Sequence, residues 1–287
     1  MTILPESINF HITQRCNYCC RYCFAKYDNH GNELILEHQI KIINELIENG
    51  CKKINFAGGE PTLVSHLSYL IIHAKEQGAF TSLISNGTLL GENLLDLIQD
   101  SIDMIGLSID SNRLEVENAL GRTFKNLDER NSKFSHVNLI KNRARLINNY
   151  NIPLKINTIV TPLNWKENLT DLMCELKPKR WKVLEIHHIN GVNNNFFEEI
   201  GQLEKWQFQQ FLDCHKSLNP VVEDSNIISE SYCMITPDGR FYQDTDDDYQ
   251  YSTPILEVGA LYAFKQINFS QVKYFKREGD YFKSTVG

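Results

Sequence analysis

The sequence predicts an α/β fold, a partial barrel of six βα units with a carboxyl-terminal extension. Short apolar runs alternate along the chain with segments whose apolar residues recur at helical spacing. Strands and helices in this order are typical of a parallel sheet with helical connections. About six such units fit before residue 190, fewer than the eight of a closed barrel. We therefore expect a partial barrel over residues 1–190 and an extension over residues 191–287, joined in one structural unit.

Six strands and five helices account for the predicted barrel. The first helix illustrates the pattern, because Ile40, Ile43 and Ile47 recur at helical spacing and Gly50 follows as a stop signal. The strands are expected at residues 8–12, 53–56, 80–84, 104–109, 154–160 and 181–187. The helices are expected at residues 36–49, 65–77, 93–99, 136–150 and 164–176. Residues 111–133 are polar and irregular, so we expect a long loop with a short helix there.

The regular alternation of strand-like and helix-like segments ends at about residue 190. Residues 193–195 are asparagines and indicate a turn, which precedes a predicted helix at 203–217 and a predicted strand at 227–235. Pro237, Asp238 and Gly239 predict a hairpin turn. The acidic run 244–248 is most simply a solvated loop, and the final segment of the chain is aromatic and basic.

Composition limits the classes of protein to which the chain can belong. It has 287 residues, 42% of them hydrophobic, and a net charge of −7, so it can bury a substantial core. An acidic surface is unsuited to general nucleic-acid binding, which neutralises phosphates with basic side chains. No apolar run approaches the roughly 18 residues of a membrane span, and the first residues lack a signal core. We expect a cytoplasmic protein without nucleic-acid or membrane partners.

Three cysteines near the amino terminus form the most informative motif. Cys16, Cys20 and Cys23 have C-x3-C-x2-C spacing. Structural four-iron clusters usually take four cysteines, so three cysteines predict a cluster with one iron left open. The alternative is a zinc site, because Cys19 creates overlapping C-x2-C pairs, but no second pair follows later in the chain. The remaining cysteines are expected to be small buried hydrophobes: Cys51, Cys174, Cys214 and Cys233.

The cysteine motif resembles that of the radical S-adenosylmethionine superfamily. In that superfamily the open iron binds S-adenosylmethionine, which is split into a 5′-deoxyadenosyl radical. Tyr22 and Phe24, beside the last cysteine, also fit the pattern. The resemblance implies a 4Fe–4S cluster on the three cysteines, S-adenosyl-L-methionine as cofactor, and a reducing compartment that protects the cluster from oxygen.

Polar motifs follow the next predicted strands, at the ends where parallel α/β sheets bind ligands. Gly58 and Gly59 allow the backbone to approach a ligand closely, and Glu60 can receive an ammonium group. The superfamily resemblance assigns this segment to the methionine amino group of the cofactor. Further donors to the cofactor carboxylate and ribose are expected from Asn86, Ser108 and Arg122. The alternatives are a simple turn at the glycines and an exposed arginine at position 122.

Charged side chains occupy two predicted strands. Lys155 and Asn157 share one face of the fifth strand, and Arg180 and Lys182 share a face near the sixth. Strands covered on both faces are normally apolar, and a buried cation is costly without a partner. We therefore expect an anionic ligand such as a triphosphate. In the alternative interpretation, these side chains point to solvent or pair with a neighbouring carboxylate.

Longer segments resemble viperin and the prokaryotic viperin-like enzymes, a family within the same superfamily. The similar segments are residues 8–18, 53–61, 155–157, 177–178, 180–183, 224–226, 231–232 and 276–281. The resemblance therefore extends from about residue 6 to 281. The membrane helix that begins vertebrate viperin is absent from this sequence, which favours a free cytoplasmic enzyme. Glu278 stands where the family often has glycine.

The family resemblance implies a lyase-type radical enzyme that dehydrates a ribonucleoside triphosphate, with CTP or UTP favoured. The radical would remove the 4′ hydrogen of the ribose. Loss of the 3′ hydroxyl and one-electron reduction would then give a 3′-deoxy-3′,4′-didehydro nucleotide, an antiviral chain terminator. An electron donor such as flavodoxin or ferredoxin is implied. Two alternatives stay open: a radical enzyme acting on a peptide or cofactor precursor, and a non-catalytic zinc-binding protein.

The resemblance also assigns substrate contacts, and the extension would complete this nucleotide site. Tyr232 is the candidate catalytic residue near the ribose, with a packed strand tyrosine as the alternative, and Asn226 could read the base. Lys276 and Arg277 could fold over the phosphates as a lid. The implied contacts of the triphosphate and of the pocket floor are Lys155, Asn157, Arg180 and Lys182, and Asn9 and His11.

Overall fold

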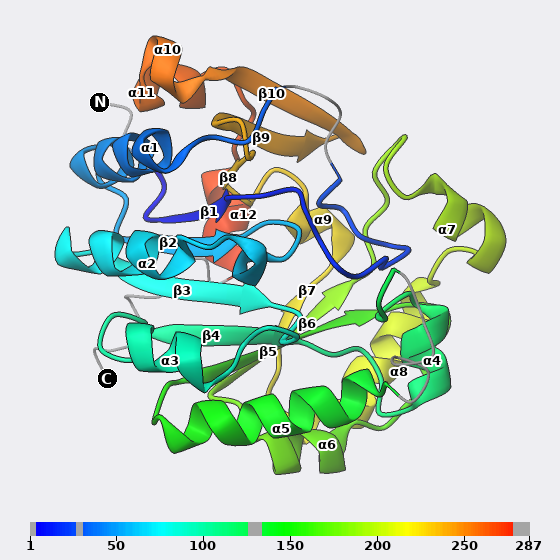
Figure 1. The fold of residues 1–287 in the computed structure, drawn as a ribbon. Helices are drawn as coiled ribbons and strands as arrows, with labels where there is room; N and C mark the ends of the chain where they lie inside the picture. Colours follow the sequence, from blue (N-terminus) through cyan, green and yellow to red (C-terminus); the bar gives the residue numbers. More distant parts are fainter. Residues whose placement is uncertain (1–3, 27–30, 126–133, 278–287) are drawn as a thin grey trace.

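The computed structural model describes residues 4–26, 31–125 and 134–277. Within these ranges the centre of the fold is a ten-stranded sheet with the order β10-β9-β8-β1-β2-β3-β4-β5-β6-β7 (Figure 1). Strands β1 to β7 run parallel in sequence order, β8 is parallel to β1, and β8, β9 and β10 pair antiparallel. The strands are β1 (Ser7–His11), β2 (Lys53–Ala57), β3 (Phe80–Ser85), β4 (Met104–Ser108), β5 (Leu154–Val160), β6 (Arg180–Glu185), β7 (Val221–Glu223), β8 (Met234–Ile235), β9 (Arg240–Thr245) and β10 (Asp248–Pro254).

The helices of the barrel connect successive parallel strands, which confirms the predicted α/β class. Figure 1 shows α1, α2, α3 and α5 along one side of the sheet. The barrel helices are α1 (Leu36–Glu48), η1 (Pro61–Leu63), α2 (Leu67–Glu76), α3 (Glu92–Ile98), α4 (Leu114–Ala119), α5 (His136–Asn149) and α6 (Thr170–Leu176). Those of the extension are α7 (Asn194–Ile200), α8 (Lys205–His215), η2 (Lys216–Leu218), α9 (Ser225–Ile228), α10 (Ile255–Val258), α11 (Ala260–Phe264) and α12 (Gln271–Lys276).

Alternation along the strands separates the hydrophobic core from a cavity. In β1, Ile8 and Phe10 are fully buried in the core, whereas Asn9 and His11 line the cavity on the other face. The reason is the two-residue repeat of a β-strand, in which successive side chains point to opposite faces of the sheet. The apolar face packs under the helices, and the polar face is left for a ligand.

The sixth helix is shorter than predicted. It begins at Thr170 rather than at residue 164. Asn164 accepts hydrogen bonds from the amide and hydroxyl of Thr161, at 2.7 and 3.0 Å, and donates to the carbonyls of Asp110 and Ile159. These bonds hold the chain in a turn, because an asparagine side chain competes with helical backbone bonding.

The predicted strand at 227–235 is largely wrong. Residues 225–228 form α9 instead, capped by the Asp224 side chain, which accepts from the amide of Ile227 at 2.7 Å. The backbone of Glu230 then adopts a positive φ of 61°, and strand pairing resumes only at β8. The apolar residues of this segment indicated a strand. The helix cap at Asp224 and the left-handed backbone of Glu230 instead prevent a continuous extended conformation.

Two other expectations about the extension are corrected. Residues 194–200 form α7, beginning inside the asparagine run that had indicated a turn, and β7 was not predicted. The acidic run is not simply a solvated loop: Asp244 lies in β9 and is only 3% exposed, whereas Asp246 and Asp247 form an exposed turn with positive φ. Segment 278–281, part of the family resemblance, lies outside the described residues.

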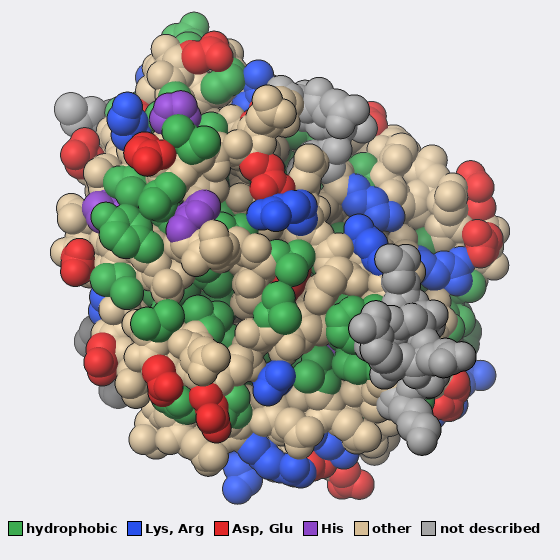
Figure 2. Space-filling model, viewed as in Figure 1, with side chains coloured by type: hydrophobic (Ala, Val, Ile, Leu, Met, Phe, Trp, Pro, Cys, Tyr) green, Lys and Arg blue, Asp and Glu red, His purple; other side chains and the backbone are tan. Residues whose placement is uncertain are grey.

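No helix in the described part of the chain combines the length and apolar character needed to cross a membrane. On the visible face, Lys and Arg side chains are interspersed with Asp and Glu (Figure 2). The charged residues that matter most for the site are buried.

Candidate active site

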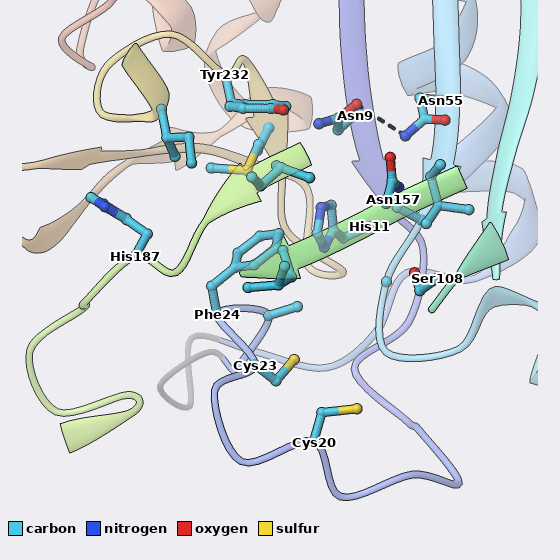
Figure 3. Close-up of a pocket in the computed structure, with 18 of the residues that line it drawn as sticks. Asn9, His11, Cys20, Cys23, Phe24, Asn55, Ser108, Asn157, His187 and Tyr232 are labelled. Carbon is cyan, nitrogen blue, oxygen red and sulfur yellow. Dashed lines mark hydrogen bonds between the residues drawn. The ribbon is translucent and has the colours of Figure 1, made fainter. Parts of the chain in front are cut away.

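A single cavity brings together the cysteine loop, the ends of the barrel strands and parts of the extension. Figure 3 shows Cys20, Cys23 and Phe24 toward one end, and Tyr232, Asn9 and Asn55 toward the other. The extension contributes lining residues from α9, β8, β9, β10 and the segment after α12. Motifs separated by more than 250 residues in sequence therefore face one space.

The cysteine loop places three thiols in the cavity wall: Cys16, Cys20 and Cys23. The loop is anchored by Tyr18, whose hydroxyl bonds the ring of His136 at 3.0 Å, and by the amide of Arg21, which donates to a carbonyl at 3.0 Å. Cys19 is exposed and is not a lining residue. Its sulfur instead lies 3.7 and 3.8 Å from the carbonyls of residues 121 and 123.

The donor set fits an iron–sulfur cluster. Burial raises the pKa of Cys16, Cys20 and Cys23 above that of an ordinary thiol, so their thiolates require a compensating cation. Among the described residues, no three His, Cys, Asp or Glu side chains converge as ligands of one metal ion. A four-iron cluster with one open iron would take one cysteine on each of its other three irons, so its ligands would not have to converge on a point.

Glu60 is a fully buried acceptor beside the cysteine loop. Its Oε1 accepts from the amide and hydroxyl of Thr62, at 3.1 and 2.6 Å, and from Ser85 at 2.7 Å. Its Oε2 accepts from the amide of Asn86 at 2.7 Å. Burial nevertheless raises the pKa of Glu60, so a cationic ligand group would stabilise the carboxylate.

The glycines before Glu60 have a packing role. A Cβ atom on Gly59 would collide with the backbone carbonyl of Arg15, and one on Gly58 with that of Thr13. The amides of residues 59 and 60 donate to these same carbonyls, at 2.7 and 2.8 Å. Glycine is therefore required for the cysteine loop to lie directly on this segment.

The remaining predicted cofactor contacts lie around the same end of the cavity: Asn86, Ser108, Arg122, Tyr22 and Phe24. Arg122 is only 7% exposed, so it is not a solvent-facing loop arginine. Its guanidinium contacts the buried carboxylates of Asp110 and Glu117, and the Tyr22 hydroxyl also donates to Asp110. These contacts hold the arginine at the cavity wall.

A group of four buried cations lines the opposite end of the cavity, and we call it the cation group. Its members are Lys53, Lys155, Lys182 and Arg277, between 2% and 8% exposed. Burial lowers the pKa of Lys155 to about 8, and burial with neighbouring cations lowers that of Lys53. Lys53 was not predicted as a site residue. It lies two residues before Asn55 in β2, so the two side chains share one face of the strand, and both line the cavity.

A carboxylate lies within the cation group. Glu223, at the end of β7, is fully buried and contacts the Lys182 ammonium and the Tyr232 hydroxyl. Lys182 Nζ donates to the Tyr232 hydroxyl at 2.7 Å, and the Arg277 guanidinium lies 3.8 Å from the centre of the Tyr232 ring. Tyr232 is therefore part of a charged network that faces the cavity. No sequence signal identified Glu223, because its strand was not predicted.

Three residues predicted to contact the substrate do not line the cavity: Arg180, Asn226 and Lys276. Arg180 begins β6 opposite Lys155 and is not among the lining residues, although its charge contributes to the lowered pKa of Lys155 and Lys53. Asn226 is exposed because its segment forms α9, and Lys276 is exposed at the end of α12. Asn9, His11, Asn157 and Arg277 do line it.

Comparison with known proteins identifies similar sequences. A model of the radical SAM superfamily matches residues 10–173. An S-adenosylmethionine-dependent nucleotide dehydratase of Flammeovirga pacifica is 33% identical over 97% of this chain and 96% of its own length. The S-adenosylmethionine-dependent nucleotide dehydratase RSAD2 of Danio rerio is 31% identical over 96% of this chain and 78% of its own length.

Solved structures show the same fold at lower sequence identity. SuiB of Streptococcus suis bound to S-adenosylmethionine superposes with a TM-score of 0.68 at 15% identity, covering 94% of this chain and 67% of that one. Native anSMEcpe with bound AdoMet and a peptide gives a TM-score of 0.67 at 17% identity, covering 94% and 82%. At these identities the likeness concerns the fold.

Proposed function

Because this chain belongs to the radical SAM superfamily and, within it, to the S-adenosylmethionine-dependent nucleotide dehydratases, we propose that it dehydrates a ribonucleoside triphosphate. The 4′ hydrogen of the ribose is removed, the 3′ hydroxyl leaves as water, and one electron is taken up. The product is a 3′-deoxy-3′,4′-didehydro nucleoside triphosphate, which lacks the hydroxyl that a polymerase extends.

The cation group is the strongest observation in favour of a triphosphate substrate. Four buried cations lie in the same cavity as three thiols, in a protein of net charge −7. Within the group, Glu223 is the carboxylate that contacts both Lys182 and Arg277. Burying this many positive charges is unfavourable unless an anion joins them. A triphosphate supplies several negative charges and many acceptor oxygens for lysine and arginine.

The other end of the cavity suits the cofactors of this superfamily. Cys16, Cys20 and Cys23 would hold a 4Fe–4S cluster, and Glu60 would hold the amino group of S-adenosylmethionine. When bound, these groups supply a 5′-deoxyadenosyl radical, which abstracts hydrogen. The further contacts proposed for the cofactor carboxylate, ribose and adenine are Tyr22, Phe24, Gly58, Gly59, Asn86, Ser108 and Arg122.

The protein's own contribution is to position the ribose between the two ends. His11 and Asn157 lie at mid-cavity, and Asn9 lies nearer the cation group, where Asn55 donates to it at 3.1 Å. The Oδ1 atom of Asn157 is buried and has no hydrogen-bond partner in the described part of the chain, so it can accept from a ribose hydroxyl. Holding the 4′ carbon near the radical is the main requirement of the reaction.

Tyr232 is proposed as the catalytic residue beside the ribose. Its hydroxyl accepts from Lys182 and donates to Glu223, so a proton can be exchanged with either neighbour. We further propose that a flavodoxin or ferredoxin supplies electrons, and that the oxygen-sensitive cluster places the enzyme in a reducing compartment such as the cytoplasm.

Anaerobic reconstitution followed by a nucleotide panel tests this function. We expect 5′-deoxyadenosine to form much faster with one ribonucleoside triphosphate than without any. Mass spectrometry of that reaction should show a nucleotide product lighter by one water molecule. Equal rates with and without every triphosphate would refute the proposal.

A further inference from the structure

The contacts proposed for the cofactor and the phosphates leave one wall of the cavity without an assigned ligand group. It is formed by the segment after β6, by α9 and by the β9–β10 hairpin, and we call it the hairpin wall. Figure 3 shows His187 on this wall, between the levels of Tyr232 and Phe24. The thiols mark the cofactor end and the cations the phosphate end, so this wall is available to the base. Its lining residues are Ile186, His187, Ile189, Ile228, Gln243, Asp244 and Tyr249.

Asp244 carries an acceptor atom with no partner on this wall. The residue is 3% exposed, and its Oδ2 is hydrogen-bonded to the Nε2 atom of His187. Its Oδ1 is buried and has no hydrogen-bond partner among the residues that the structure describes. A buried carboxylate oxygen without a donor is unfavourable. The atom is therefore suited to a hydrogen-bond donor that a ligand brings.

The position of this carboxylate is fixed from several sides. The Glu230 amide donates to the Asp244 carbonyl at 3.0 Å, and the Asp244 amide donates to Gln243 Oε1 at 3.1 Å. The other ring nitrogen of His187 lies 3.3 Å from the Ser225 hydroxyl. A pre-positioned acceptor of this kind can discriminate between ligands, because it does not have to rearrange on binding.

We propose that Asp244, held by His187, reads the base by accepting a hydrogen bond from an exocyclic amino group, and so selects CTP over UTP. The inference rests on the proposed function. A carboxylate can only accept, and cytosine presents an amino donor where uracil presents a carbonyl oxygen. With UTP, two acceptors would face each other. The flanking Ile189 and Ile228 provide apolar surface for a planar ring.

Equilibrium binding of CTP and UTP to the reconstituted enzyme tests the assignment. Wild type should bind CTP roughly tenfold to a hundredfold more tightly than UTP. Asp244→Asn should bring the two affinities close together or reverse them, because an amide can turn a donor toward the uracil oxygen. Asp247→Asn is the matched control: it removes the same charge from an exposed turn of the same hairpin and should keep the wild-type ratio.

The outcomes separate this inference from the proposed function. Nucleotide binding with a wild-type preference for UTP, or an unchanged ratio in Asp244→Asn, overturns the inference alone. If thermal melting shows that Asp244→Asn does not fold, the ratio of CTP affinity to UTP affinity in the wild type alone tests the inference. If no triphosphate binds or stimulates 5′-deoxyadenosine formation, the proposed function falls, and this inference with it.

Discussion

The hydroxyl of Tyr232 donates a hydrogen bond to the carboxylate of Glu223 inside the cation group. A carboxylate opposes phosphate binding, so its place there requires another explanation. Lys182 and Arg277 depress the pKa of Glu223 despite its burial, so it is ionised and orients the Tyr232 hydroxyl. The pair thereby links the phosphate contacts to the residue proposed to act at the ribose.

Replacing Glu223 with glutamine should separate binding from turnover. Removing the negative charge should tighten triphosphate binding by at least roughly tenfold, because like charges about 10 Å apart repel by about 1.7 kcal/mol at an effective dielectric constant of about 20. The rate of 5′-deoxyadenosine formation at saturation should fall, because Tyr232 loses its charged acceptor. Nucleotide titration and single-turnover rates measure the two effects. Weaker nucleotide binding by this variant would contradict the role assigned to Glu223.

Lys182→Ala should weaken nucleotide binding and leave S-adenosylmethionine binding nearly unchanged. Truncating one partner of a buried charge pair typically costs about 2–5 kcal/mol, so a loss of at least about thirtyfold in nucleotide affinity is expected. Lys179→Ala is the matched control, because Lys179 is exposed just before β6. Equal nucleotide affinities of the two variants would refute the phosphate assignment.

Nucleotide affinity should depend on pH through Lys155. Burial lowers the pKa of this lysine to about 8 in the free protein, so it loses its proton above that pH. A bound triphosphate favours the charged amine, so binding takes up a proton and weakens as the pH rises beyond 8, by at most roughly tenfold per unit. Lys155→Arg should reduce this dependence, because arginine stays charged. Isothermal titration of the nucleotide at several pH values measures this dependence. A wild-type affinity that does not change with pH would contradict the role assigned to Lys155.

Alanine at Cys16, Cys20 or Cys23 should abolish the visible absorption of a reconstituted cluster. Alanine at Cys19 should leave it intact, because the Cys19 sulfur lies outside the cavity lining. Iron and zinc analysis of the same samples checks the composition. Stoichiometric zinc with no iron in the anaerobically reconstituted wild type would instead support a zinc site.

Much of the barrel could be predicted because its signals are local. Strand alternation and helical spacing located β1 to β6 within two residues, and the cysteine and glycine motifs lie at predicted strand ends. The prediction failed where local bonds override the apolar pattern, mostly in the extension and once in the barrel. Asp224 caps a helix in a segment that reads as a strand, and Asn164 holds a turn in a segment that reads as a helix.

The sequence by itself determined the parallel sheet, the three thiols and the charged strand positions, because each depends on spacing along one segment. Only the tertiary structure decided which charges share the cavity. It brought Lys53 and Arg277 into the same cavity from β2 and the end of α12, set Glu223 of β7 against Lys182 and Arg277, and left Arg180 and Asn226 out of the lining. It also buried Asp244 against His187. Such contacts depend on how far each strand extends and on how the extension packs, and neither is encoded in the spacing of neighbouring residues.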